Sequence, residues 1–578
     1  MSRYEVWAPN ATRRVDVEVD GSAYELARCP ERVGWWSGEA PAGDYAFRLD
    51  GGPPLPDPRS PRQPYGPDGP SRAVDHAAFR WSRTGWRGRA LPGAVLYELH
   101  VGTFTARGTF EAAAEQLDHL VELGVDLVEL MPVCPFPGKH GWGYDGVAPW
   151  AVHEPYGGPE GLKRFVDAAH RKGLGVVLDV VHNHLGPSGN HLPAYGPYFT
   201  DRHHTPWGSA VNLDAPGSDE VRAYLVGSAL AWLRDYRIDG LRLDAVHALV
   251  DDRAVHFLEE LSREVEKLAA SSNRPLFLIA ESDLNTPRTT AAREAGGQGL
   301  TAQWNDDFHH ALHCALTGES QGYYADFAAA PLTALAKTLR HGFFHDGTWS
   351  SFRGRGHGRP FGADAAGHRL LGYLQTHDQV GNRALGDRIS TSLTPGRLAC
   401  GAALVLTAPF TPMLFMGEEW GAATPWQYFT DHTDPALAEA VRQGRRREFA
   451  EHGWAAEAVP DPQEPATVLR SVLDWTEPRR APHTELLDWH RTLIRLRRER
   501  PELAEPDLGA VRVDVDEAAG RLVLHRGPYR IAVNLGPAEA LLPLGGTGRE
   551  LVAAFGAALL EDSGVRLAAD AVAVVRTG

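Results

Sequence analysis

Residues 175–184 read GVVLDVVHNH, and residues 239–247 read DGLRLDAVH. Each begins as a nearly continuous apolar run of strand length and then breaks into polar sequence, as strands buried on both faces do. Amphipathic stretches flank these runs, such as GPEGLKRFVDAAHRKG at 158–173, where apolar residues recur at i, i+3 and i+4. Strands that alternate with such helices predict a parallel sheet built from βα units.

The strand-like runs between residues 94 and 420 number eight, which fits a (β/α)8 TIM barrel of the α/β class. In such a barrel the chemistry lies at the C-terminal ends of the strands. The eight predicted runs are AVLYELHVG from Ala94, VDLVELMPV from Val125, GVVLDVVHN from Gly175, DGLRLDA from Asp239, LFLIAES from Leu276, a weak TAQWNDD from Thr301, LLGYLQTHD from Leu370 and PMLFMGEEW from Pro412.

Two smaller β domains are expected on either side of the barrel. Residues 1–90 hold short alternating runs split by Gly, Pro and Asp, which predict an N-terminal β-sandwich, immunoglobulin-like and similar to a carbohydrate-binding module. Its Pro-rich part, 51–70, is expected to be extended or ordered by packing, and not helical. The barrel is assigned to 91–490, and the alternating runs of 491–578 predict a C-terminal antiparallel β domain.

Composition limits the possible partners. Hydrophobic content of 43% and charged content of 23% are ordinary for a soluble globular protein. A formal net charge of -16 argues against nucleic acid and against an anionic membrane as partners, because both require a basic face. A neutral substrate such as a sugar is compatible with this charge.

The four cysteines, Cys29, Cys134, Cys314 and Cys400, lack CxxC spacing and are expected to be reduced thiols. The N-terminus has no apolar signal core, and the most apolar stretch, 399–416, is interrupted by prolines and too short to span a bilayer. We therefore expect a cytoplasmic protein.

Three acidic residues, Asp244, Glu281 and Asp378, each follow a different strand-like run, and the run at 175–184 adds Asp179 and His184. Carboxylates at strand ends are costly to gather because like charges and desolvation oppose it. A single such Asp is commonly a helix cap or turn residue. An ordered set at the C-terminal strand ends instead favours catalysis, and a nucleophile paired with a general acid is what glycoside cleavage needs.

These residues lie in four fragments, DVVHNH (179–184), GLRLDAVH (240–247), AES (280–282) and THD (376–378). In their order and positions the fragments resemble the four motifs of the α-amylase clan, glycoside hydrolase family 13. The resemblance implies a retaining mechanism in which Asp244 is the nucleophile, Glu281 the acid and then the base, and Asp378 a ligand for the hydroxyls of the distorted sugar. Retaining carboxyl pairs lie about 5–5.5 Å apart.

The resemblance also implies how the pocket is tuned. Arg242 points to the same side of its strand as Asp244 and would keep that nucleophile ionised, whereas Glu281 needs a raised pKa to carry a proton. Thr376 departs from the clan, which usually has Asn there, and puts local hydrogen bonding in question. The expected substrate-binding residues are Tyr144, the stacking tyrosine of GWGYDG, with Asp179, His184, Arg242, His377 and Gln379.

No metal and no cofactor are expected. Asn183 stands where calcium-dependent amylases supply a ligand, but the segment after it, 185–215, is short for the loop domain that a hard cation would need. Aromatic residues of this segment and of the region after the eighth strand could wall the leaving-group side or simply pack. They are Tyr195, Tyr198, Phe199, Trp207, Trp426, Tyr428 and Phe429.

Longer stretches resemble one family within the clan, the malto-oligosyltrehalose trehalohydrolases. They include YELHVGTFTARGTF (97–110), DVVHNHLGPSGNHL (179–192), THDQVGNRA (376–384) and FMGEEW (415–420). The resemblance implies cleavage of the α-1,4 bond beside the terminal α,α-trehalose of a malto-oligosyltrehalose, with release of trehalose. It further implies a pathway partner, malto-oligosyltrehalose synthase, and we expect a monomer.

Two other interpretations remain open. A glycogen branching or debranching enzyme, or a general α-amylase, shares the barrel and the catalytic trio, since fold does not determine specificity. A glycan-binding or transporter-associated protein could keep the barrel without the chemistry, although the intact Arg242, Asp244, Glu281 and Asp378 argue against it. Product analysis separates these interpretations.

Overall fold

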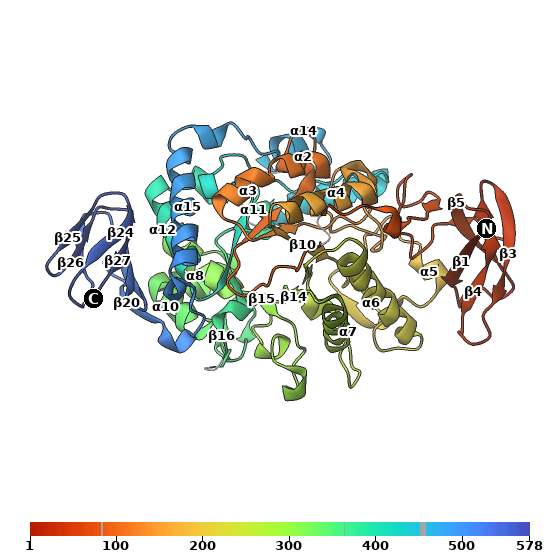
Figure 1. Ribbon diagram of the computed structural model, residues 1–578, viewed down its shortest axis with the longest axis horizontal. Helices are drawn as coiled ribbons and strands as arrows, with labels where there is room; N and C mark the ends of the chain where they lie inside the picture. The colour runs from red at the N-terminus through yellow and green to blue at the C-terminus, as the bar shows by residue number, and fades with distance from the viewer. Residues whose placement is uncertain (83–84, 363–364, 451–457) are drawn as a thin grey trace.

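The centre of the molecule is a closed barrel of eight parallel strands, in the order β10-β13-β14-β15-β18-β19-β8-β9 (Figure 1). The computed structural model describes residues 1–82, 85–362, 365–450 and 458–578. Every barrel strand coincides with one of the eight predicted runs, so the predicted barrel is confirmed. The strands are β8 (Leu96–Leu99), β9 (Leu127–Leu130), β10 (Gly175–Val180), β13 (Gly240–Leu243), β14 (Phe277–Ala280), β15 (Ala302–Trp304), β18 (Leu370–Gly372) and β19 (Thr411–Phe415).

Helices surround the barrel (Figure 1). In α4, the residues Leu162, Phe165, Val166 and Ala169 are buried at the i, i+3, i+4, i+7 spacing that the sequence predicts. No described helix has both the length and the apolarity that crossing a membrane would require. The main helices are α2 (Phe110–Glu115), α3 (Leu117–Leu123), α4 (Gly158–Arg171), α6 (Ser218–Asp235), α7 (Phe257–Ser272), α8 (Asp306–Thr317), α10 (Pro331–His341), α12 (Pro395–Thr407) and α15 (His483–Glu499).

The N-terminal domain is an antiparallel sheet at one end of the molecule, in the order β1-β4-β3-β2-β5-β6, with β7 paired to β5 (Figure 1). Arg62, in the Pro-rich part, forms ion pairs with Glu154 and Glu160 of the barrel domain, so this part is ordered by packing. The strands are β1 (Ser2–Trp7), β2 (Val15–Val19), β3 (Ser22–Arg28), β4 (Trp35–Ala40), β5 (Asp44–Leu49), β6 (Pro54–Leu55) and β7 (Ser71–Arg72).

Two aromatic residues considered above as walls of the leaving-group side instead join the N-terminal sheet to the barrel. The Tyr195 hydroxyl donates hydrogen bonds to the carbonyls of Leu55 and Pro56, at 3.2 and 2.8 Å. The ring of Tyr198 lies edge-on to that of Trp7, with centroids 5.3 Å apart. Both tyrosines are buried because they complete an interface between domains, which their position in the sequence did not reveal.

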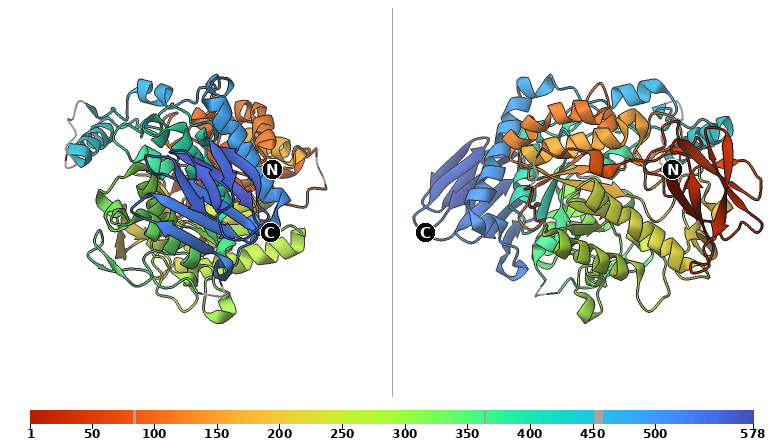
Figure 2. Two further views of the ribbon diagram at one scale, coloured as in Figure 1. Left: turned by 90° about the vertical axis from the view of Figure 1, so that its left-hand side faces the viewer. Right: turned by 45° about the vertical axis from the view of Figure 1, so that its right-hand side comes forward.

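The C-terminal domain packs at the opposite end, against α10 and α12 (Figure 2). It contains a five-stranded antiparallel sheet, β20-β21-β22-β27-β24, and a three-stranded sheet, β23-β26-β25. The predicted antiparallel character is confirmed. The strands are β20 (Arg512–Asp516), β21 (Arg521–Arg526), β22 (Tyr529–Asn534), β23 (Ala540–Pro543), β24 (Glu550–Phe555), β25 (Ala558–Glu561), β26 (Gly564–Leu567) and β27 (Ala571–Arg576).

Arg397, on α12, links this domain to the barrel, and its replacement is expected to lower stability. Its guanidinium pairs with Asp570 at 2.9 Å and donates to the carbonyls of Leu316 and Leu535, each at 2.8 Å. Arg397→Ala leaves these acceptors unpaired and should lower the free energy of unfolding by about 2 kcal/mol. Thermal unfolding measures this effect. Arg512→Ala, at an exposed arginine, is the control, and an equal melting temperature in both variants would contradict the assigned link.

Candidate active site

The C-terminal ends of neighbouring barrel strands bring the predicted acidic residues together. Asp179 lies at the end of β10, Asp244 directly follows β13, and Glu281 directly follows β14, the three strands being adjacent in the barrel. Asp378 lies in α11 (His377–Gly381), which follows β18. Asp244, Glu281 and Asp378 line a cavity of about 350 Å³, whereas Asp179 lies behind it. The lining residues are Trp142, Tyr144, Asp145, His184, Trp207, Asp244, Ala245, His247, Glu281, His377, Asp378, Tyr428 and Phe429.

Arg242 is the cation around which these carboxylates gather. Its Nη1 lies 2.7 Å from Asp244 Oδ1 and 2.9 Å from Asp179 Oδ2, and its Nη2 lies 3.8 Å from Glu281 Oε2. The guanidinium is fully buried and also lies over the ring of Trp304, 4.4 Å from the ring centroid. This contact holds the Asp244 carboxyl group beside a permanent positive charge.

Asn183 holds the Asp244 carboxylate from the other side. Its amide nitrogen donates to Asp244 Oδ2 at 2.7 Å and to the Asp244 carbonyl at 2.8 Å. Its amide oxygen lies 2.6 Å from His184 Nδ1. Sequence reasoning considered Asn183 only as a possible cation ligand and missed this contact. Its position inside DVVHNH, between the predicted site residues Asp179 and His184, was the one available signal.

Glu281 is held in a position and an environment that suit a general acid. Its Oε2 accepts a hydrogen bond from the backbone N–H of Ala245 at 2.6 Å, and Ala245 adopts a left-handed conformation with φ of 38°. Such a conformation costs a non-glycine residue about 1–2 kcal/mol. Burial, aided by the charges of Asp244 and Asp378 and opposed by Arg242, raises the pKa of Glu281 to about 8.

Thr376 performs the local hydrogen bonding that its departure from Asn put in question. Its hydroxyl oxygen accepts from the backbone N–H of Asp378 at 3.2 Å and so caps α11. The same hydroxyl donates to the amide oxygen of Gln379. Among the described residues Gln379 does not line the cavity, whereas Asp378 does. Gln379 therefore supports the turn that presents Asp378.

Tyr144 joins two of the predicted substrate-binding residues. Its hydroxyl donates to Asp179 Oδ2 at 2.6 Å and lies 2.8 Å from His377 Nε2. Its ring also stacks on that of His377, with centroids 5.1 Å apart. The Tyr144 hydroxyl thus connects Asp179 to His377, a role beyond the sugar stacking that was predicted for the Tyr144 ring.

The cavity walls include aromatic residues on two sides. The ring of Trp207, about half exposed, stacks on His184 with centroids 4.5 Å apart. Tyr428 and Phe429 line the cavity, whereas Trp426 is fully buried and stacks on Trp142 with centroids 5.3 Å apart. Sequence reasoning did not propose Trp142 or His247 as lining residues, because no periodicity distinguishes a loop residue that faces a cavity.

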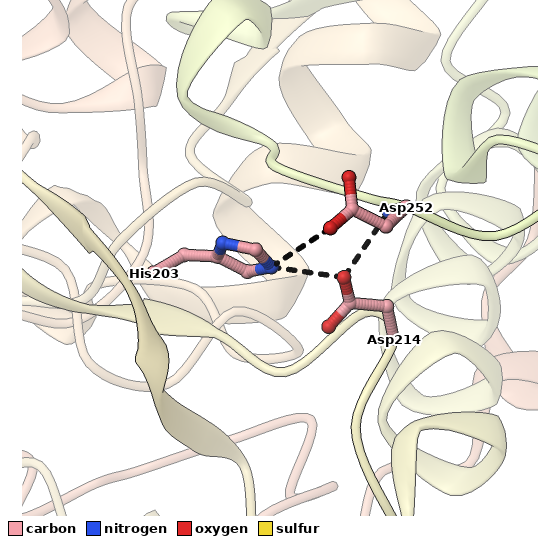
Figure 3. Close-up of side chains that lie close together, drawn as sticks. All are labelled: His203, Asp214 and Asp252. Carbon is pink, nitrogen blue, oxygen red and sulfur yellow. Dashed lines mark hydrogen bonds and ion pairs between the residues drawn. The ribbon is translucent and has the colours of Figure 1, made fainter.

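One group of the described residues has the ligand types that a metal ion would need, namely His203, Asp214 and Asp252 (Figure 3). His203 Nε2 lies 2.9 Å from Asp214 Oδ2, which also accepts from the backbone N–H of Asp252 at 3.1 Å. Asp252 is exposed. His203 and Asp214 are thus paired with each other, and none of the three residues lines the cavity that Asp244 and Glu281 share.

Comparison with known proteins assigns the family. Residues 79–193 match "Alpha amylase, catalytic domain", and residues 506–574 match a domain of unknown function, DUF3459. The chain is 55% identical to a malto-oligosyltrehalose trehalohydrolase of Arthrobacter ramosus, over 99% of each protein. It is 52% identical to the enzyme of the same name from Mycobacterium tuberculosis strain H37Rv, over 100% of this chain and 99% of that one.

The chain belongs to the malto-oligosyltrehalose trehalohydrolases. A crystal structure of an α-amylase-type protein from Salmonella typhimurium shares the fold with a TM-score of 0.90 and 38% identity, covering 100% of this chain and 97% of that one. The resemblance found in the sequence motifs is thereby confirmed, and trehalohydrolases share the retaining chemistry of the α-amylase family.

The raised pKa of Glu281 predicts the alkaline limit of activity. The acid acts in its protonated form, so kcat/KM should hold below about pH 8 and fall above it. Glu281→Gln cannot donate a proton and should lose about 10²–10⁴-fold in kcat/KM, with no alkaline limb in the residual activity. The measurement is a pH profile of initial rates. Near-normal turnover by the Gln variant would place the acid elsewhere.

Removal of metal ions is expected to leave activity unchanged. The amide oxygen of Asn183, the atom of this side chain that could bind a cation, already lies 2.6 Å from His184 Nδ1, and the amide nitrogen donates to Asp244. The test is to compare initial rates before and after dialysis against EDTA, with a calcium-dependent α-amylase treated in parallel. Loss of activity that added Ca²⁺ restores would show that the site requires a cation.

Proposed function

We propose that this chain cleaves the α-1,4-glucosidic bond beside the terminal α,α-trehalose of a malto-oligosyltrehalose, releasing trehalose and a shortened maltodextrin. Identity of 52–55% to trehalohydrolases along the whole chain supports the substrate. The observation that carries the chemistry is the single guanidinium of Arg242 that contacts Asp244 and Glu281 together. Arg242 pairs closely with Asp244 but lies 3.8 Å from Glu281, whose burial raises its pKa to about 8 against that charge. The two carboxyl groups therefore suit the separate roles of nucleophile and acid in a retaining hydrolase.

The first step forms a glycosyl ester. Asp244 attacks the anomeric carbon with an oxygen lone pair while Glu281 transfers its proton to the departing glycosidic oxygen of the trehalose unit. Asn183 and Arg242 each bind one carboxylate oxygen of Asp244 and so fix its direction of attack. In the second step Glu281, now ionised, takes a proton from water as the water attacks the ester, which restores both carboxyl groups.

The remaining predicted residues hold the sugar whose bond is cleaved. Asp378 has a side chain that is 42% exposed, the most accessible of the three acids, and is suited to accept hydrogen bonds from sugar hydroxyls. His377, Tyr144 and His184 line the same cavity. Asp179 is buried behind Tyr144 and Arg242, so its proposed contribution is to orient these two side chains.

Trp207 is the residue best placed to recognise the trehalose end. It lies between β11 (Phe199–Thr205) and β12 (Gly208–Val211), the hairpin that occupies the segment after β10. One face of its ring stacks on His184, and about half of the side chain is exposed beside Asp244 and Glu281. A rigid aromatic face at a sugar-sized cavity provides a platform for an apolar sugar face.

We further propose that the enzyme acts in the cytoplasm as a monomer, after a malto-oligosyltrehalose synthase has formed the trehalosyl end. Its four cysteines are unpaired, which is compatible with a reducing compartment. The large apolar side chains exposed on the described surface are distributed over several elements in all three domains, including Val33, Trp349 and Leu559. Size-exclusion chromatography tests the monomeric state.

Product analysis tests the substrate. The purified enzyme is given maltotriosyltrehalose and, in parallel, maltopentaose, which has the same number of glucose units without the trehalose end. We expect trehalose and maltotriose from the first and far slower cleavage of the second. Asp244→Asn should form neither product, which controls for contaminating glycosidases.

Other outcomes identify the alternatives. Equal cleavage of both substrates would indicate a general α-amylase. Transfer products, or release of α-1,6-linked chains from glycogen, would indicate a branching or debranching enzyme. Tight binding of maltodextrins without turnover of any substrate would indicate a glycan-binding protein.

A further inference from the structure

We propose that Glu98, buried in β8, is a positioning residue that keeps His377 doubly protonated, so that His377 Nε2 always presents a hydrogen to the site. This inference rests on the proposed role of His377 in the active site. Glu98 Oε1 lies 2.5 Å from His377 Nδ1, and Glu98 Oε2 accepts from the His377 backbone N–H at 3.0 Å. Both residues are 1% exposed.

The directions of the surrounding hydrogen bonds determine where the protons lie. Both oxygens of Asp179 accept from Arg242 Nη1, at 3.1 and 2.9 Å, so Asp179 is an acceptor. The Tyr144 hydroxyl therefore donates its one hydrogen to Asp179, at 2.6 Å. Its oxygen then accepts from His377 Nε2 at 2.8 Å, which requires a hydrogen on that nitrogen.

The other ring nitrogen faces the Glu98 carboxyl group. Glu98 Oε2 accepts from the His377 backbone N–H, and Oε1 lies 2.5 Å from Nδ1. We assign the hydrogen between them to Nδ1, because a charge-assisted hydrogen bond is stronger than a neutral one, and the imidazole is then a cation with hydrogens on both nitrogens. The electrostatics agree, because Glu98 and Asp378 outweigh the effect of burial and raise the pKa of His377 to about 9.

A second buried cation has a clear use in this pocket. Arg242 pairs with Asp179, Asp244 and Glu281, and His377 adds a positive charge beside Asp378, whose Oδ1 lies 3.5 Å from Nε2. With its two ring hydrogens held by Glu98 and Tyr144, the imidazolium adds a fixed positive charge beside Asp378, the proposed acceptor of the sugar hydroxyls. Hydrogen bonds to those hydroxyls strengthen in the transition state of glycoside cleavage. The charged or titratable groups around His377 are Glu98, His100, Glu129, Tyr144, Asp179, Arg242 and Asp378.

The neighbouring strand provides a matched control. Glu129 on β9 is the register partner of Glu98 and is equally buried. Neither of its carboxyl oxygens has a hydrogen-bond partner among the described residues. Burial, with the nearby charge of Glu98, raises its pKa well above the ordinary value. Glu129→Gln thus replaces a neutral side chain by another neutral one of the same shape. Glu98→Gln instead removes the negative charge that we propose pairs with His377.

The experiment compares pH profiles of kcat and KM for the wild type, Glu98→Gln and Glu129→Gln. In Glu98→Gln the His377 ring loses its buried counter-charge, so its pKa should fall to its ordinary value of about 6.5 or below. The alkaline limb should therefore move from about pH 8, where Glu281 sets it, down by about one unit or more. At neutral pH, kcat should fall about 10–100-fold with little change in KM. Glu129→Gln should keep the wild-type profile.

An unchanged alkaline limb in Glu98→Gln, or the same shift in Glu129→Gln, would overturn the inference. Loss of one member of a buried ion pair can prevent folding. Glu98→Gln is therefore also combined with His377→Asn, and this double variant lacks both charges of the pair. With no imidazole to titrate, the second substitution should not move the alkaline limb further. A further shift there would also overturn the inference. If His377→Asn alone keeps wild-type activity, the proposed role of His377 fails, which is a separate result.

Discussion

The fully buried charge of Arg242 is the interaction on which the site depends. Taking a guanidinium out of water is costly unless carboxylates and hydrogen bonds compensate for it. Here Asp179, Asp244 and Glu281 do so, and the same contacts offset the repulsion that would otherwise separate these carboxylates. Removing one partner of such a buried pair typically costs about 3–5 kcal/mol, so the arrangement is stable only as a whole.

The fold was predictable because two simple patterns specify it. Strands covered on both faces are apolar along their length, and the helices that cover them carry an apolar stripe, so both patterns are visible in the sequence. The acids were predictable for the same reason, since Asp244 and Glu281 stand immediately after such runs. Asp378 follows its strand at greater distance, and the match to an ordered set of motifs was needed to interpret it.

Side chains whose partners lie far away in the chain were less predictable. Tyr195 and Trp207 both follow β10 in an aromatic segment, yet Tyr195 anchors the N-terminal sheet and Trp207 reaches the cavity. Asn183 and Gln379 illustrate the same limit in opposite directions. Asn183 binds the carboxyl group of Asp244, while Gln379 bonds to the capping Thr376. Only the three-dimensional contacts separate these outcomes, because the residue types and their spacing would allow either.

Glu98 and Glu129 show how neighbouring positions of one barrel can differ in charge. Both are glutamates on adjacent strands, paired in register and closed to solvent. Glu98 meets a ring nitrogen and a backbone N–H of His377, which can stabilise its negative charge, whereas Glu129 meets no donor among the described residues. The proposed second cation, His377, therefore lies where the Glu98 carboxyl group of β8 can pair with it. In this proposal the protonation of His377, which lines the cavity, depends on Glu98, which does not line it.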